Sequence, residues 1–157
     1  MTAKPDKEAS SFRLAPFEVR VISGQSAVRD ALSQLLEALQ PLQLDIEEAG
    51  TIEIVLAEVL NNILEHAYPP TEPEGPIHIN CAHSKDGLLL HIKDSGSAMP
   101  EGKLPLGSLA SLDVELDDMP EGGFGWFMIK SLAKDVSYRR VGAENHLNLR
   151  LAVGMSA

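Results

Sequence analysis

The sequence is short of basic residues, of cysteine and of long apolar runs. Lysine and arginine together number 13 against 23 aspartates and glutamates, which gives a formal net charge of −10. Nucleic acid as the main partner is therefore disfavoured, because binding to phosphate backbones needs a basic face. A basic protein surface or a metal–nucleotide complex fits this charge better.

The single cysteine, Cys81, excludes an internal disulfide, and its place in an alternating apolar segment predicts a buried thiol. No run of about 18 apolar residues is present, so we expect no membrane-spanning helix. The N-terminus lacks the apolar region of a secretory signal, and the expected location is the cytoplasm. A chain of 157 residues is long enough for one domain with a real core.

Hydrophobic periodicity predicts an α+β fold built as a two-layer α/β sandwich. Alternating apolar residues predict strands over about 17–21, 77–82, 88–92, 136–138 and 147–153. Helical spacing predicts helices over about 26–39, 45–68 and 126–134. Because strands joined by short turns must run antiparallel, we expect a mostly antiparallel sheet with the three helices on one face.

Local signals set the expected ends of the first two helices. Ser26 resembles an N-cap, and Asp45 followed three residues later by Glu48 resembles a capping box. Pro69 and Pro70 end the second helix, because proline cannot donate to the helical hydrogen-bond ladder.

Two segments lack any periodicity. Residues 1–11 are polar and are expected to form a disordered tail, which leaves 12–157 as a single domain. Residues 97–121 combine prolines and glycines with an acidic second half. A stretch of this length without regular structure is usually functional or mobile in a compact domain.

The second predicted helix carries a polar stripe where a core helix should have none. Glu58, Asn62 and His66 are four residues apart, so on a helix they share one face among apolar neighbours. Buried polar groups need partners, and we infer that the partner here is a ligand. His66 fits either a structural or a site-lining role, whereas Asn61 and Glu65 are expected to face solvent or support the site from outside.

This polar stripe and the motifs that follow it along the chain could each contact part of a bound nucleotide. Asn62 can offer its side-chain oxygen to Mg²⁺, and Glu58 can accept a proton from an attacking hydroxyl or water. Asp94 can accept a hydrogen bond from an adenine amino group, and Gly96 lets the backbone approach the base. The glycines of 122–125 expose N–H groups at a helix N-terminus, which favours phosphate. The Asp94-x-Gly96 motif alone is also a common turn, and the glycine-rich segment could be a hinge. The Glu58–Asn62 pair is a stronger signal, because two buried polar groups are costly without a partner. The shared order of all the motifs carries the hypothesis.

That order resembles the Bergerat-type ATP-binding fold shared by gyrase, Hsp90, histidine kinases and MutL. Glu58 to His66 resembles its N-box, Asp94-x-Gly96 its G1 box and Gly123-x-Gly125 its G2 box. Within this superfamily the chain is most similar to the small anti-sigma serine kinases of the RsbW and SpoIIAB type, including the strand at 145–149. The resemblance covers roughly residues 12–153.

The resemblance implies binding of ATP with Mg²⁺ and phosphorylation of a serine or threonine on a small anti-anti-sigma partner of the STAS fold. It also implies that such proteins hold a sigma factor inactive, commonly as homodimers. Glu58 would be the catalytic base, Asn62 the metal position and 97–121 the ATP lid. The implied ATP-binding residues are Asn62, His66, Asp94, Gly96, Ala98, Met99, Gly122, Gly123, Phe124 and Gly125.

Three features depart from the family pattern. The segment 94–98 lacks the second glycine of a full Asp-x-Gly-x-Gly box. No arginine lies within 97–121, so Lys103, or Lys130 if its helix turns it inward, is the available cation for a γ-phosphate contact. No dimerisation helix bearing a phosphorylated histidine precedes the domain, so we do not expect a complete histidine kinase.

Three functions compete at this point. The first is an ATP-dependent serine/threonine kinase that acts on a STAS partner and thereby frees a sigma factor. The second is a binding module that holds ATP and switches a partner without phosphate transfer. The third is a catalytic fragment that receives or relays phosphate within a multi-protein signalling system. Glu58 separates the first two, because only the kinase needs a base.

Overall fold

The computed structural model describes residues 14–99 and 123–155, and within these residues five strands form one sheet. The strands are β1 (Phe17–Ile22), β2 (Pro76–Ser84), β3 (Gly87–Asp94), β4 (Lys134–Val141) and β5 (Glu144–Leu151). Their order across the sheet is β1-β2-β3-β5-β4, and every neighbouring pair is antiparallel. The predicted antiparallel sheet is confirmed.

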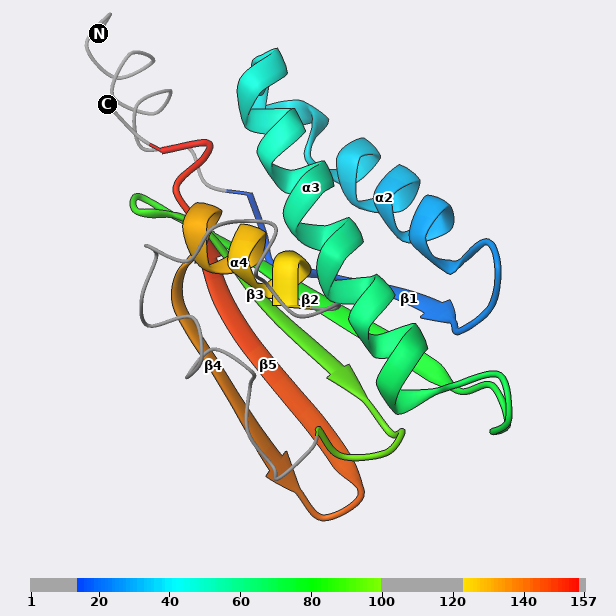
Figure 1. Cartoon of the computed structure of the whole chain (residues 1–157). Coiled ribbons are helices and arrows are strands. Elements are labelled where there is room, and N and C mark those ends of the chain that lie inside the picture. The colour runs from blue at the N-terminus through cyan, green and yellow to red at the C-terminus, as the bar shows by residue number, and fades with distance from the viewer. Residues whose placement is uncertain (1–13, 100–122, 156–157) are drawn as a thin grey trace, which may run out of the picture.

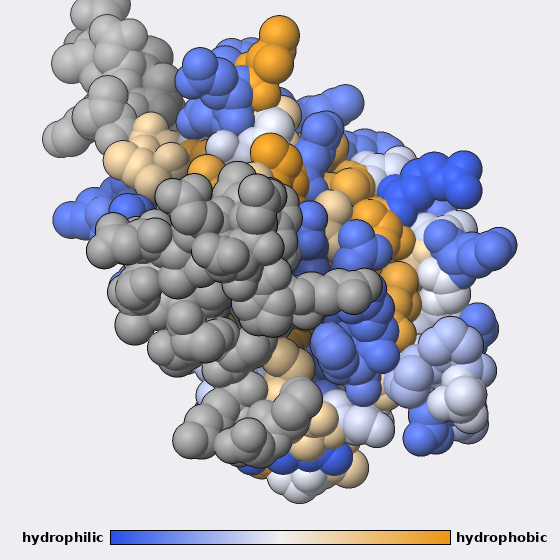
Figure 2. All heavy atoms as spheres, viewed as in Figure 1, coloured by the Kyte–Doolittle hydropathy of each residue, from blue (hydrophilic) through white to orange (hydrophobic). Residues whose placement is uncertain are grey.

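The helices form a second layer on one face of this sheet (Figure 1). They are α2 (Ala27–Ala38), α3 (Ile46–Asn62) and α4 (Gly123–Leu132), with a short 3₁₀ turn, η1 (Gln40–Leu42), between the first two. The α+β sandwich expected from the periodicity is therefore the observed architecture. Viewed from the helix side, the surface shows hydrophobic atoms among hydrophilic ones (Figure 2).

The core lies between the two layers and is built by strand alternation. Val19, Ile79, Ile92 and Leu147 are in register across β1, β2, β3 and β5, and all four are buried beneath the helices. Apolar residues of α3 close the core from above. Burial of each such side chain contributes about 1.5–3 kcal/mol of transfer free energy, so the alternating pattern fixes which face of each strand meets the helices. Cys81 is buried in the same layer, as predicted.

The predicted helix starts are both observed, but their capping differs. At α3 the Glu48 backbone N–H donates to Asp45 Oδ1 at 2.8 Å, and the Asp45 N–H donates to Glu48 Oε1 at 3.1 Å. This is a complete capping box, as predicted. Ser26 precedes α2, but its hydroxyl donates to the Asp30 carboxylate at 2.9 Å and caps no backbone N–H.

The spacing of apolar residues predicts that the second helix continues to Tyr68, but its α-helical geometry ends earlier. α3 ends at Asn62 and is followed by a single π-helical turn, η2 (Ile63–Ala67), in which the Tyr68 N–H donates to the Ile63 carbonyl at 3.0 Å. The wider turn changes the four-residue spacing after Asn62, although Asn62 and His66 still line one cavity. Such turns occur frequently at functional sites.

No helix in the described part of the chain is long and apolar enough to cross a bilayer. Most of the long aperiodic segment and the N-terminal tail lie outside the described residues. The predictions of a tail at 1–11 and of a functional loop at 97–121 therefore remain predictions beyond Met99.

Candidate functional site

A small cavity lies where α3, η2 and α4 meet the ends of β3 and β5. Asn62, His66, Asp94 and Met99 line it, so the structure brings together four of the residues singled out from the sequence. The cavity volume is about 30 Å³, far below the ~300 Å³ of a typical ligand pocket. A ligand would therefore have to displace side chains at its rim, and the flexible Met99 side chain is suited to that movement.

Asn62 and Glu58 meet at Gly125, the third residue of α4. The Asn62 side chain is buried, and its Nδ2 donates to the Glu58 backbone carbonyl at 2.8 Å. Because a carbonyl only accepts, this bond holds the amide with Oδ1 facing away from the helix. A Cβ atom at Gly125 would lie 2.6 Å from Glu58 Oε2 and 3.5 Å from Asn62 Nδ2. A Cβ atom here would displace the flexible Glu58 carboxylate, so glycine lets the helix N-terminus approach that carboxylate where it lies.

This arrangement suits Mg²⁺ that arrives with a substrate. The described residues contain no cluster of three or more His, Cys, Asp or Glu side chains able to hold a metal. Mg²⁺ commonly keeps several waters and binds through one or two protein oxygens plus phosphates, so a single free amide oxygen on Asn62 fits that mode.

Asp94 ends β3 with a carboxylate that is only 4% exposed. Burial raises the pKa of Asp94 above its ordinary value, and hydrogen bonds from Asn145 and Gly96 oppose that rise. Asn145 Nδ2 donates to Asp94 Oδ1 at 2.8 Å, and the Gly96 N–H donates to the same oxygen at 2.9 Å.

The sequence reasoning missed Tyr138 and Asn145, which both line the cavity from β4 and β5. The Tyr138 hydroxyl donates to Asn145 Oδ1 at 2.6 Å and accepts from the Met99 N–H at 3.0 Å. One signal was available: Asn145 lies two residues before Leu147, on the strand face that the alternation assigns to the core. A buried amide at that position needs a partner.

Gly96 allows its backbone to lie close to another group, and in the structure that group is the protein backbone at Ala67. A Cβ atom at Gly96 would clash with the backbone carbonyl of Ala67, at the end of the π turn. The same carbonyl accepts a hydrogen bond from the Ser97 N–H at 3.0 Å. The glycine therefore lets the segment after β3 pack against η2, which the sequence motif alone does not reveal.

The remaining predicted site residues differ in position. His66 lies at the cavity rim with 43% of its side chain exposed, 3.8 Å from Glu65 Oε2. Ala98 and Lys130 are exposed and do not line the cavity. α4 begins at Gly123, earlier than the predicted start at Trp126, and the adjoining Phe124 side chain lies outside what the structure describes. Gly122 and Lys103 also lie outside the described residues.

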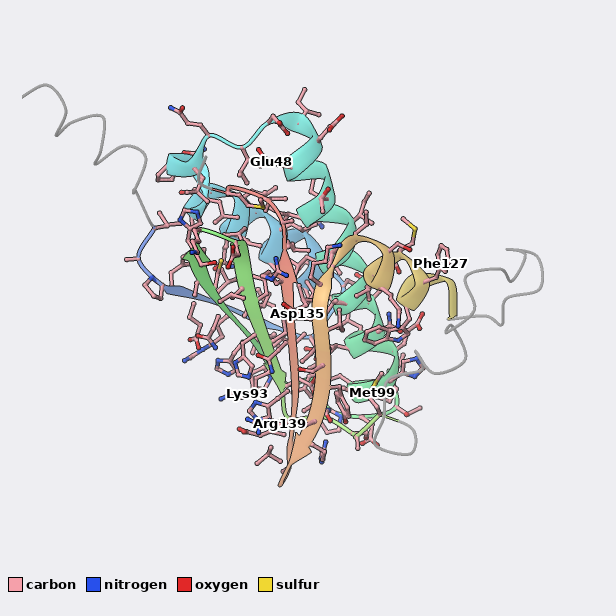
Figure 3. The ribbon with its side chains drawn as sticks, turned by 90° about the vertical axis from the view of Figure 1, so that its left-hand side faces the viewer. Glu48, Lys93, Met99, Phe127, Asp135 and Arg139 are labelled. Atoms are coloured by element: carbon pink, nitrogen blue, oxygen red, sulfur yellow. The ribbon has the colours of Figure 1, made fainter. Side chains whose placement is uncertain are left out.

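Larger hollows exist elsewhere but hold none of the predicted catalytic groups. One of about 580 Å³ lies on the helix-free face of the sheet, where Leu89, His91 and Arg150 line it. Another of about 430 Å³ lies on the far side of the Ser95–Ser97 backbone. Figure 3 shows Met99 on the helix side of the sheet and Lys93 and Arg139 on the opposite side. Asn62, Asp94 and Asn145 line the smaller cavity, whereas Glu58 does not line it and lies against Gly125.

Comparisons with known proteins match most of the chain. The family model described as the histidine kinase-like ATPase domain matches residues 23–151. The serine/threonine-protein kinase BtrW of Bordetella bronchiseptica is 33% identical over 99 residues, which cover 63% of this chain and 67% of that protein. The serine-protein kinase RsbW of Staphylococcus aureus is 30% identical over 120 residues, covering 74% of this chain and 73% of that protein.

A solved structure of the RsbU and RsbW domains of a Mycobacterium tuberculosis protein has a similar fold. The TM-score is 0.60 at 18% sequence identity, and the match covers 88% of this chain. The chain spans about a third, 32%, of that larger protein chain. At this identity the similarity concerns the fold.

Proposed function

The chain belongs to the histidine kinase-like ATPase domain family, and from that premise we propose that it is an ATP- and Mg²⁺-dependent protein serine/threonine kinase. The relatives named as serine or serine/threonine kinases support the reaction class. The observation that carries the proposal is the meeting of Glu58, Asn62 and the α4 N-terminus at Gly125. A proton acceptor, a metal-ligand oxygen and phosphate-binding N–H groups are the parts that phosphoryl transfer requires.

In this proposal the adenine base enters the cavity beside Asp94, and the phosphates lie at the α4 N-terminus. Bound Mg²⁺ would neutralise charge on the phosphate oxygens. The serine or threonine oxygen of the partner attacks the γ-phosphorus, and its proton passes to the Glu58 carboxylate as ADP leaves. Asn62 holds its oxygen ready because its amide nitrogen is already bonded to the helix backbone.

The proposed protein substrate is a STAS-type anti-anti-sigma factor, and the proposed target of inhibition is a sigma factor. Both follow from the similarity to the RsbW type, as do a homodimer and a cytoplasmic location. Binding of the chain to the STAS protein would free the sigma factor, and phosphorylation of the STAS protein would release it and let the chain bind the sigma factor again. The acidic chain would meet basic surface on its partners, which mainly affects the association rate.

The test combines a transfer assay with a nucleotide-binding assay. The purified chain is incubated with γ-labelled ATP, Mg²⁺ and a STAS-domain protein of the same host, and phosphoserine or phosphothreonine is located by mass spectrometry. We expect Glu58→Gln to lower the transfer rate by about 10²–10⁴-fold while leaving the affinity for ATP nearly unchanged.

Glu53→Gln is the matched control, because Glu53 is exposed on the same helix and should leave the rate unaltered. Full transfer by the Glu58→Gln variant would remove Glu58 as the base. Tight ATP binding by the wild-type chain without transfer to any candidate partner would instead indicate a nucleotide-dependent switch.

A further inference from the structure

The buried Asp94 carboxylate has one oxygen engaged and one available. Oδ1 accepts from Asn145 Nδ2 and from the Gly96 N–H. No donor among the described residues bonds Oδ2. Every side-chain oxygen of these residues that is fully buried has a hydrogen-bond partner. Oδ2 therefore keeps some accessible surface, and Asp94 lines the cavity from which a ligand can approach it. An ionised carboxylate oxygen only accepts, so a ligand must present a donor there.

Asn145 fixes this division of the two oxygens. Its side-chain nitrogen donates to Asp94 Oδ1 and to the Ser97 carbonyl, each at 2.8 Å. Its side-chain oxygen accepts from the Tyr138 hydroxyl at 2.6 Å and from Arg140 Nη1 at 3.1 Å. Three of these partners demand the same orientation of the amide, because two of them only accept and the guanidinium only donates. The Tyr138 hydroxyl, which can donate or accept, is compatible with it.

Tyr138 connects this amide to the segment that follows β3. Its hydroxyl donates to Asn145 and accepts from the Met99 N–H, so one group links the amide that bonds Asp94 to the residue at the cavity rim. Arg140 Nη1 also donates to the Gly96 carbonyl at 2.7 Å. Three side chains of the β4–β5 hairpin thus hold the backbone of residues 96–99.

We propose that Tyr138 and Asn145 are positioning residues that make Asp94 selective for the 6-amino group of adenine. The proposal rests on the ATP binding proposed above and adds the groups that determine which base is accepted. With Oδ1 engaged, the free Oδ2 accepts the amino group of adenine. A base with a carbonyl at this position, such as guanine, places two acceptors together and leaves both unpaired.

The decisive experiment varies the base and the protein together. Dissociation constants are measured by calorimetry with Mg²⁺ for ATP and for purine riboside triphosphate, which lacks the 6-amino group. We expect the wild-type chain to prefer ATP by about tenfold or more. Tyr138→Phe should reduce that preference several-fold by weakening ATP and leaving the analogue unchanged. A role limited to stability would weaken both ligands equally, and an unchanged ratio would overturn the proposal.

Asn145→Asp supplies a second, isosteric readout. The new carboxyl group would face Asp94 Oδ1 across the present 2.8 Å contact, and the two groups would share a proton. The shared proton restores a donor at acidic pH, so the preference for ATP should be retained there and lost as the pH rises. A preference that does not change with pH would contradict the assignment of Asn145.

The control is Tyr68→Phe, which changes the chain's other tyrosine. Its hydroxyl accepts from the Ser95 N–H at 2.7 Å and donates to the Pro76 carbonyl at 2.8 Å, so it holds the same segment without touching Asn145. The ratio of the affinities for ATP and for the analogue should stay at the wild-type value, and an equal fall in this control would also overturn the proposal.

The wild-type chain separates the two proposals. If it binds neither triphosphate, the proposed function fails. If it binds both equally, the positioning role fails.

Discussion

An added methyl group at two glycines of the site would meet different kinds of neighbour. At Gly96 an added methyl group would meet the Ala67 backbone, which cannot yield without moving η2. At Gly125 it would meet Glu58 Oε2, the end of a flexible side chain. The first position therefore constrains the fold, whereas the second constrains the location of a carboxylate.

Alanine substitutions should separate these two constraints. Gly125→Ala should keep the melting temperature or raise stability by up to ~1 kcal/mol, because alanine is the better helix former within α4. It should also lower phosphate transfer by about 10²-fold by displacing Glu58. Gly96→Ala should cost about 1–3 kcal/mol of stability. Thermal melts and the transfer assay check both; full transfer by Gly125→Ala would contradict the placement of Glu58.

Individual polar residues were predictable where they interrupted a regular apolar pattern. Asn62 stands out in a helix that is otherwise apolar on its buried face, and Asp94 ends an alternating strand. Tyr138 did not stand out, because β4 is largely exposed and polar residues are expected there. Asn145 lies on β5, where the alternation of buried residues offered a signal. The bond from Met99 to Tyr138 joins residues 39 positions apart, a contact that local spacing cannot encode.

Among the elements, α3 shows which helix boundaries are determined by neighbouring residues in the sequence and which by tertiary contacts. Its start follows from the Asp45 capping box, and the prolines after Tyr68 limit its extent. The π turn between Asn62 and Tyr68 carries no such local signal. Its last residue, Ala67, receives a hydrogen bond from Ser97, so the turn is stabilised by a segment that arrives only after the β2–β3 hairpin.

On the helix-free face, β3 and β5 place two histidines together. His91 Nε2 and His146 Nδ1 are 2.8 Å apart, and their rings stack with centroids 5.0 Å apart. Burial lowers the pKa of His91 most, followed by repulsion from His146, Lys93 and Arg139, while Glu144 opposes the shift. The folded state therefore favours neutral His91.

The stability of the sheet should consequently depend on His91 in acid. A histidine whose pKa is lowered on folding contributes stability above its unfolded pKa of about 6.5, and this stability is lost as the pH falls below that value. His91→Gln removes the titration, so its melting temperature should fall less than that of the wild type between pH 7 and pH 5. If the melting temperatures of the two proteins fall equally between pH 7 and pH 5, His91 does not contribute to the pH dependence of stability.

At the scale of the whole molecule, the sequence predicts the elements and their hairpins better than their lateral order. The β2–β3 and β4–β5 hairpins follow from short turns, with Gly87 and Gly142 at positive φ. The pairing of β1 with β2 and of β3 with β5 joins strands separated by helices, and only the complete fold determines it. That order brings Asp94 beside Asn145 and so completes the site.

Nucleotide binding should therefore stabilise the whole domain, because a ligand at the proposed site would contact α3, α4 and the sheet together. A ligand at 100 times its dissociation constant adds about 2.7 kcal/mol, which corresponds to roughly 5–11 °C in melting temperature for a chain of this size. We expect a shift of this order with ATP and Mg²⁺, and a smaller one when EDTA removes the metal.

Asn62→Ala should abolish the metal-dependent part of the shift in melting temperature. Asn61→Ala, at the exposed neighbouring position, should retain it. A shift that is the same with and without Mg²⁺ would rule out Asn62 as the metal position, because its free oxygen would then have no cation to hold.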